Sequence, residues 1–259
     1  MPAKKKPFIL ITNDDSISAG GIKALVEAMK PLGDILVVAP DKPQSGMGHA
    51  ITIHDPLRLK PSNEFPGIEA YTCSGTPVDC VKLAIYEIIK DRPTFLVSGI
   101  NHGSNAATNV LYSGTMSAAV EGAIENIPSI GFSLLDHAAD ADFEAAAHYA
   151  RIIAQGVLDN GLQPGICLNV NIPKATKKEI KGLKICRQGK AFWEDSFDKR
   201  KDPFGGEYYW LTGAFERTDK GEDTDLWALE NNYVSIVPTH FDMTAHHLIS
   251  TMNEWDLKV

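Results

Sequence analysis

Two adjacent carboxylates, Asp14 and Asp15, stand just after a short apolar segment, Phe8–Thr12. Neighbouring negative charges repel each other, and they are costly to hold together unless water or a cation separates them. Hard divalent cations such as Mg²⁺ and Mn²⁺ prefer carboxylate, amide and hydroxyl oxygens as ligands. The pair is therefore a candidate metal site, although a solvated turn or a cap of the following helix would use the same residue types.

Three further residues carry oxygen or amide groups that suit the same chemistry. Ser45 lies in a Gly-containing loop, and Asn101 and Asn105 bracket Gly103 in another loop. A side-chain amide offers a neutral oxygen to a metal and an NH₂ group to a phosphate. Each of these residues, taken alone, is equally typical of an ordinary turn.

The segment Ser113-Gly114-Thr115 opens a stretch that is expected to be helical. The first N–H groups of a helix lack partners within the helix, and the helix dipole favours negative charge at that end. This segment is therefore a candidate phosphate site. The alternative is that Ser113 or Thr115 only caps the helix.

Alternating strands and helices are expected to position these residues. Phe8–Thr12 and Ile35–Ala39 are apolar, β-branched runs that predict buried strands, and residues 21–32 between them carry apolar side chains at helical spacing. The alternation predicts further strands at residues 69–73, 94–98, 129–134 and 166–172, and helices at residues 78–90, 115–126 and 143–158. It indicates an α/β fold with a doubly wound, mostly parallel sheet over residues 1–175.

The candidate residues follow the expected strands in a consistent way. Asp14, Ser45 and Asn101 each come after the carboxyl end of a different strand. In open α/β sheets, ligands bind in the crevice beyond these ends. We therefore expect the metal-type oxygens and the phosphate-type helix start to meet at one edge of the sheet.

The pattern changes after residue 175. Strands are expected at residues 183–187, 207–211 and 234–237, and a short helix at residues 226–230. The stretch from residue 189 to residue 221 is rich in charge, glycine and aromatic side chains, and we expect an extended hairpin whose aromatic residues are buried against another subunit. The alternative is a flap over the sheet of the same chain. Residues 1–259 are thus expected to form a single domain, with residues 176–259 as a C-terminal part.

Composition narrows the class of protein. With 25 basic and 33 acidic residues among 259, the formal charge is 25 − 33 = −8, which argues against binding polymeric nucleic acid. The chain contains no run of about 18 apolar residues that could span a membrane, and the basic N-terminus is followed by too short an apolar run for a signal peptide. The four cysteines form no C-x-x-C pair and are expected to be reduced and buried. We expect a cytoplasmic protein.

Five motifs in a fixed order resemble the SurE family, the survival phosphatases that act on nucleoside monophosphates. They are Leu10–Asp15, Val37–Gly46, Gly75–Val81, Val97–Asn105 and Tyr112–Thr115, the last followed by Ala118-Ala119 and Glu121-Gly122. Asn169-Val170-Asn171-Ile172-Pro173 is also similar to the family. Two residues depart from the family pattern: Ser16 stands in place of glycine and His49 in place of asparagine, which bears on substrate preference.

The resemblance implies one divalent metal, Mg²⁺ or Mn²⁺, held by Asp14, Asp15, Ser45 and Asn101. It implies phosphate contacts from Asn105 and from Ser113, Gly114 and Thr115. It also implies a Rossmann-like core and a C-terminal extension exchanged between the subunits of a homodimer or homotetramer.

These features predict a metal-dependent phosphomonoesterase that hydrolyses nucleoside monophosphates, a 5′-nucleotidase for which 3′-nucleotides and polyphosphate remain open as substrates. Asp14 is the first candidate for the carboxylate that activates water, with Asp15 mainly a ligand. A phosphatase with an aspartyl-phosphate intermediate is disfavoured because its acids are spaced Asp-x-Asp. A non-catalytic nucleotide-binding regulatory module on the same fold is the alternative function, and a dinucleotide oxidoreductase would need a Gly-x-Gly-x-x-Gly turn after the first strand.

Overall fold

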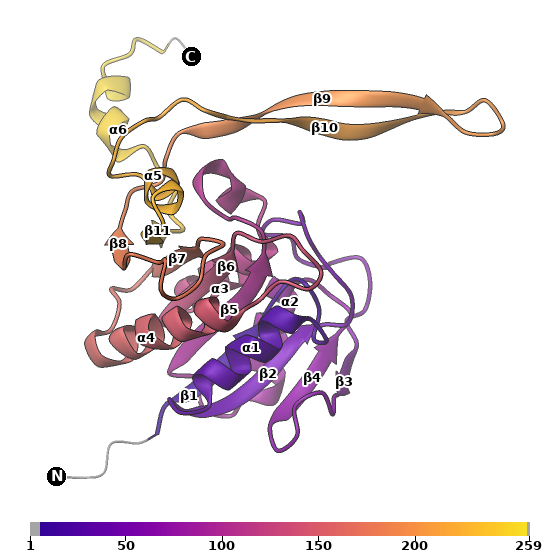
Figure 1. The fold of residues 1–259 in the computed structure, drawn as a ribbon, viewed down its shortest axis with the longest axis vertical. Coiled ribbons are helices and arrows are strands. Elements are labelled where there is room, and N and C mark those ends of the chain that lie inside the picture. The colour runs from indigo at the N-terminus through magenta and orange to yellow at the C-terminus, as the bar shows by residue number, and fades with distance from the viewer. Residues whose placement is uncertain (1–5, 258–259) are drawn as a thin grey trace.

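A computed structural model describes residues 6–257 of the chain, so the basic N-terminal residues 1–5 lie outside the described part. Within these residues, nine strands form one sheet in the order β3-β4-β2-β1-β5-β6-β7-β11-β8 (Figure 1). The strands from β4 to β7 in this order are parallel; β3 is antiparallel to β4, and β11 is antiparallel to β7 and parallel to β8. The bounds are β1 Phe8–Thr12, β2 Asp34–Pro40, β3 Leu59–Pro61, β4 Glu69–Cys73, β5 Phe95–His102, β6 Ser129–Leu134, β7 Ile166–Ile172, β8 Leu183–Ile185 and β11 Val234–His240.

Helices cover both faces of this sheet. Side chains alternate along a strand, so Ile9 and Ile11 of β1 lie in one core and Leu10 lies in the other. The first core is completed by α1 and α4, and the second by α2 and α3. The bounds are α1 Gly20–Met29, α2 Pro77–Leu83, α3 Gly114–Ile124, α4 Glu144–Asn160 and α5 Asp225–Glu230, with a π-helix η1 at Ala84–Ile88 and a 3₁₀-helix η2 at Ala107–Leu111. The predicted α/β fold with a mostly parallel sheet is confirmed.

Several predicted elements differ from the structure in their bounds: the strand predicted at residues 183–187 ends at Ile185, and those predicted at residues 207–211 and 234–237 run on to Arg217 and His240. Two further differences concern the type of a helix and the position of a site residue. The helix expected at residues 78–90 is α-helical only to Leu83 and continues as η1 to Ile88. Strand β5 does not end at Ser98 but runs on to His102, because Asn101 and His102 still pair with β6 after a register shift. Asn101 therefore lies on a strand and not in the loop where the sequence had placed it.

The C-terminal part contributes both to the sheet and to a separate arm. Strands β8 and β11 complete the sheet that the first 175 residues begin. Strands β9 (Ala191–Lys201) and β10 (Glu207–Arg217) form an antiparallel hairpin, here called the arm, that projects away from the body (Figure 1). The hairpin expected between residues 189 and 221 is present, and its aromatic side chains do not fold back as a flap over the sheet. Helix α6 (His246–Asn253), which the sequence had not indicated, buries none of its residues.

Two further sequence expectations can be compared with the structure. All four cysteines are free and buried, as expected. None of the helices among residues 6–257 is long and apolar enough to cross a membrane.

Candidate functional site

The candidate residues meet at the point where the order of strands reverses. Strand β1 lies between β2 and β5, so the chain moves to one side of β1 and later returns to the other side. Asp14 and Asp15 follow the end of β1, and Asn101 lies near the end of β5. The carboxyl ends of these parallel strands form the crevice in which open α/β sheets bind ligands.

Asp14 is held against the start of α3. Its side chain is buried, and the Thr115 hydroxyl donates a hydrogen bond to its Oδ1. A Cβ atom placed on Gly114 would lie only 2.7 Å from the Asp14 Cβ, so glycine is needed for this close approach. The Gln44 N–H donates to the Asp14 carbonyl oxygen at 2.7 Å, which ties the loop after β2 to the same point. The loop that carries Ser45 is thereby brought to the carboxylates.

Asp15 is joined to the end of β5. Its half-buried carboxylate accepts a hydrogen bond from the His102 N–H at 3.2 Å. One residue earlier, Asn101 donates its Nδ2 to the Gly103 carbonyl oxygen at 3.0 Å. This bond leaves the Asn101 Oδ1 without a hydrogen-bond donor among residues 6–257, so the amide presents its oxygen as a free acceptor.

Burial raises the pKa values of both carboxyls, and charge repulsion adds to this rise for Asp14. Burial, with the nearby Asp15 charge, raises the pKa of Asp14 to about 6, and hydrogen bonds from Thr115 only partly oppose this rise. Burial also raises the pKa of Asp15 above its usual value, against the hydrogen bond and charge of His102. The surrounding groups therefore compensate only part of the negative charge, which leaves the pair with a strong preference for a further positive charge.

The donors at this point suit a hard divalent cation. The structure, in the residues it describes, contains no group of three His, Cys, Asp or Glu side chains placed to hold a metal. The set here has two carboxylates, and the Asn101 amide oxygen and the exposed Ser45 hydroxyl supplement them with neutral oxygens. The buried Asn13 Oδ1 also has no partner in the described chain. An all-oxygen set with two negative charges fits Mg²⁺ or Mn²⁺ and does not fit a soft, thiolate-preferring metal.

The expected phosphate contacts fall into two groups. Ser113 is the N-cap of α3, and its Oγ accepts the Met116 N–H at 3.0 Å, so its oxygen serves the helix itself. Gly114 and Thr115 form the first turn, directly beside Asp14. Asn105 lies on another side: its amide donates to Ser133 of β6 at 2.6 Å, and no hydrogen bond in the described chain joins it to the carboxylate pair.

The two departures from the family pattern have structural explanations. Ser16 adopts a φ of 90°, in the region that glycine favours, and its carbonyl oxygen accepts a hydrogen bond from Asn13 at 2.8 Å. His49 lies 2.9 Å from Glu121 of α3, which also pairs with Lys82 of α2. Burial alone would raise the pKa of Glu121, but the bonds from His49 and Lys82 bring it below its usual value. His49 thus fastens the loop after β2 to α3.

Similarity to known proteins identifies the family of this chain. The family described as survival protein SurE matches residues 9–195, which contain every candidate site residue. The chain belongs to the SurE family. A 5′-nucleotidase SurE from Flavobacterium psychrophilum is 60% identical over 253 residues, covering 97% of this chain and 98% of the relative. One from Chlorobaculum tepidum is 46% identical, with 98% and 96% covered. The crystal structure of the SurE protein from Aquifex aeolicus has a TM-score of 0.82 at 39% identity, covering 95% of this chain and 98% of that one.

Four buried residues of this SurE fold were given no role by the sequence analysis. Asn169 and Asn171 of β7 and Ser133 of β6 surround Asn105. Asp225 of α5, fully buried, accepts hydrogen bonds from the backbone N–H groups of Ala107, Gly189 and Leu226. The signal in the sequence that could have found these residues is a polar side chain on an otherwise apolar strand, as in Asn169-Val170-Asn171 of β7.

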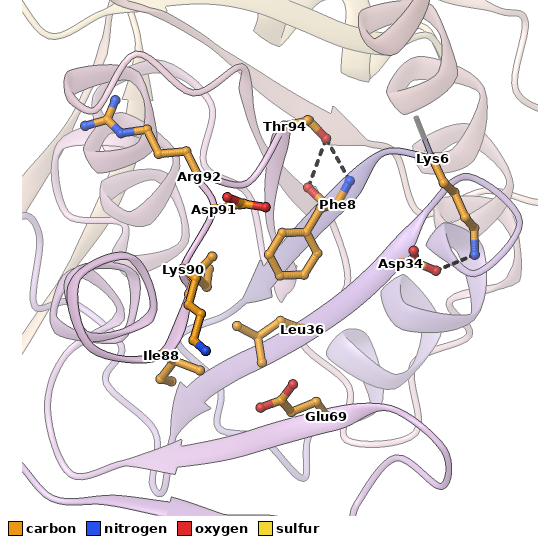
Figure 2. A pocket seen from close by; sticks show the side chains of 11 residues that line it. Lys6, Phe8, Asp34, Leu36, Glu69, Ile88, Lys90, Asp91, Arg92 and Thr94 are labelled. Atoms are coloured by element: carbon orange, nitrogen blue, oxygen red, sulfur yellow. Dashed lines mark hydrogen bonds and ion pairs between the residues drawn. The ribbon is translucent and has the colours of Figure 1, made fainter. Parts of the chain in front are cut away.

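A pocket lies at the other end of the same strands. The pocket in Figure 2 has a volume of about 420 Å³ and lies where β1, β2 and β4 begin, near Phe8, Asp34 and Glu69. Its charged groups are partly paired, for example Lys6 with Asp34. Because parallel strands place their amino ends opposite their carboxyl ends, this pocket is separated from the carboxylate pair by the length of the sheet.

The metal-free protein should lose stability as the pH rises through the titration of Asp14. Folded Asp14 keeps its proton up to pH about 6, whereas the ordinary value is 3.8. The folded state therefore binds more protons than the unfolded chain between these values, and the free energy of unfolding should fall by up to roughly 3 kcal/mol from pH 4 to pH 6. Asp14→Asn should lack this fall. Urea denaturation with a chelator present measures it, and parallel pH profiles for the two proteins would contradict the prediction.

Gly114→Ala should push the Asp14 carboxylate out of place. The added methyl group would lie 2.7 Å from the Asp14 Cβ and 3.0 Å from its Oδ2. We expect phosphate release to fall by roughly 100-fold, the scale of a misplacement of about 1 Å, and the rise in Tm on adding Mg²⁺ or Mn²⁺ to shrink. Gly156→Ala in α4 is the matched control, because its Cβ would meet nothing within 4 Å. Equal activity of the two variants would show that the close approach is unimportant.

Proposed function

We propose that the protein is a metal-dependent nucleotidase, a phosphoric monoester hydrolase that releases phosphate from nucleoside monophosphates. The observation that carries this proposal is the adjacent pair of buried Asp14 and half-buried Asp15, which lies at the switch point of the sheet beside the start of α3. Full-length relatives named 5′-nucleotidase SurE support the activity and the substrate class.

The metal in this proposal is one Mg²⁺ or Mn²⁺ ion held by Asp14, Asp15, Ser45 and Asn101. Such an ion, when bound, polarises a phosphoryl oxygen and lowers the pKa of water. Asp14 and Asp15 supply the negative charge of the site, and Asn101 and Ser45 supply neutral oxygens. The hydrogen bonds to Asp14 from Thr115 and Gln44 hold this set in place before substrate arrives.

The chain's own groups would handle the proton and the phosphate. The raised pKa of Asp14 makes its carboxylate more basic than that of a solvated aspartate, a property that a group accepting a proton from water needs. The start of α3 at Ser113, Gly114 and Thr115 supplies the positive end of a helix dipole, which favours an anionic phosphoryl group. The Thr115 N–H already donates to the Asp14 carboxylate. The Asn105 amide adds a donor to the equatorial oxygens, where charge is spread in the transition state.

The cytoplasm is the proposed site of this reaction. Four free, buried cysteines support it, since a reducing compartment keeps thiols unpaired.

Asp14→Asn should abolish turnover while the protein stays folded. Asparagine keeps the shape of the side chain but cannot accept a proton or carry the charge, so we expect phosphate release to fall by roughly 100-fold or more. The assay measures phosphate released from 5′- and 3′-nucleoside monophosphates and short polyphosphate, with Mg²⁺, Mn²⁺ or chelator. Asp159→Asn, on the exposed side of α4, is the matched control and should keep full activity.

Three outcomes would count against the proposal. Near wild-type activity of Asp14→Asn would remove Asp14 from the chemistry. Phosphate trapped covalently on Asp14 would favour an aspartyl-phosphate mechanism. Nucleotide binding without release of phosphate under any metal condition would favour a regulatory binding module.

The arm is proposed to bind a second copy of the chain in a homodimer or homotetramer. Its side chains include exposed aromatic and aliphatic groups on both strands and in the turn between them, with Phe197 65%, Leu211 64% and, in the turn, Phe204 98% exposed. A two-stranded hairpin has no core in which to bury such groups, and a partner subunit would cover them.

Removing the apolar surface of the arm should weaken assembly. Phe197 and Leu211 face each other across the hairpin, so Phe197→Ser with Leu211→Ser removes one apolar patch without breaking the backbone pairing. We expect the particle mass, measured by light scattering or sedimentation, to fall toward that of one chain. Ile152→Ser, an exposed apolar residue of α4, is the control and should leave the mass unchanged. A wild-type protein that is already monomeric would refute the role of the arm.

A further inference from the structure

Three buried polar side chains lie side by side on the strands next to the loop that carries Asn105. Asn169 and Asn171 are two residues apart on β7 and face the same side, and Ser133 of β6 pairs with Asn171 in the sheet. Their exposed fractions are 3%, 0% and 0%. Burying an amide or hydroxyl costs free energy unless the group is hydrogen-bonded, so their presence in the core needs an explanation.

The side chains of Asn169 and Asn171 and the backbone of Asn105 form a closed ring of hydrogen bonds. The Asn105 N–H donates to Asn171 Oδ1 at 2.8 Å, and Asn169 Nδ2 donates to the Asn105 carbonyl oxygen at 2.8 Å. Asn171 Nδ2 donates to Asn169 Oδ1 at 2.9 Å and completes the ring. Both backbone groups of Asn105 are thus held by side chains of a strand more than 60 residues away in the sequence.

The ring has one consistent direction. A backbone N–H can only donate and a carbonyl oxygen can only accept, so Asn105 sets the orientation of both amides. Asn171 must present its oxygen and Asn169 its nitrogen, and the remaining nitrogen of Asn171 then meets the remaining oxygen of Asn169. Aspartate at position 169 would lose the donor to Asn105 while keeping the size of the side chain.

Ser133 holds the side chain of Asn105 in place. The Asn105 Nδ2 donates to the Ser133 Oγ at 2.6 Å. An amide nitrogen carries two hydrogens, and in residues 6–257 the second one has no partner. The backbone and the side chain of Asn105 are therefore both anchored to the sheet, with one N–H left to bind a ligand.

We infer that Asn169, Asn171 and Ser133 position Asn105 for phosphate binding, an inference that rests on the phosphate-binding role proposed for Asn105. None of the three bonds with Asp14, Asp15 or Asn101. Their hydrogen bonds end on a loop residue and on one another, so the polar surface buried here serves to hold a loop. They are positioning residues, and their loss should weaken the hold on phosphate while leaving the metal ligands in place.

Asn169→Asp tests the ring. We expect the inhibition constant of inorganic phosphate and the KM for a nucleoside monophosphate to rise by roughly 10-fold, the scale for groups that orient a ligand-binding side chain. The rise in Tm on adding Mg²⁺ or Mn²⁺ alone should match that of wild type. A purely structural role would reduce the metal effect and the phosphate affinity together, and that result would overturn the inference.

Two variants keep the test independent of folding. Ser133→Ala removes only a hydroxyl and should also raise the phosphate inhibition constant, so it carries the test if Asn169→Asp does not fold. Ser235→Ala is the matched control, because Ser235 of β11 pairs with Asn171 on its other side and its buried Oγ has no partner in the described chain. Unchanged phosphate inhibition in Ser133→Ala would refute the positioning role, and an effect of Ser235→Ala equal to that of Ser133→Ala would do the same.

A double-mutant cycle separates this inference from the proposed function. If the ring acts through the Asn105 side chain, Asn169→Asp should add nothing to the effect of Asn105→Ala on phosphate inhibition. Additive effects would refute the positioning role. If Asn105→Ala alone leaves phosphate inhibition unchanged, the proposed phosphate contact itself is wrong. If it weakens inhibition while the ring variants do not, only the further inference fails.

Discussion

Two like charges share one turn of backbone in the interior of this protein, and much of the structure around them limits the cost of that arrangement. Burial raises the pKa values of Asp14 and Asp15, and the charge of Asp15 raises that of Asp14 further. The start of α3 lies beside Asp14, where its dipole favours negative charge, and Gly114 allows that approach. The end of β5 adds a backbone donor to the Asp15 carboxylate. Since this compensation is partial, the site gains most from a divalent cation.

The part of the site around Asn105, where we propose that phosphate binds, is built differently, from neutral groups. The ring of Asn169, Asn171 and Asn105 and the bond to Ser133 contain no charge, so they fix a loop without changing the field at the carboxylates. The neutral groups thus hold the loop in place, whereas the carboxylates supply the negative charge. This division explains why amide side chains occupy strand positions where an α/β sheet would ordinarily bury valine or leucine.

The site and the arm share anchors. The buried carboxylate of Asp225 accepts N–H groups from Ala107, two residues beyond Asn105, and from Gly189, where the arm begins. Trp193 of β9 donates to Asn109 at 2.8 Å. A shift at the base of the arm would therefore be transmitted to residues 107–109, which directly follow the loop that carries Asn105.

The sequence by itself determined the fold class and the kinds of atoms available for chemistry. The bounds of β1, β4, β6 and β7 were predicted because each is a short run with a clear apolar or β-branched pattern. The three-residue β3 was missed because it is too short to show a periodic pattern, and α6 was missed although Leu248, Ile249 and Met252 fall at helical spacing. Tertiary structure alone decided the hydrogen-bond partner of each group. His49 bonds with Glu121, the Ser113 hydroxyl oxygen accepts an N–H of its own helix, and Asn105 bonds with β7. The physical reason is that residue type and periodicity are local properties, whereas a hydrogen bond between Asn105 and Asn171 depends on strands that approach only when the whole sheet has formed.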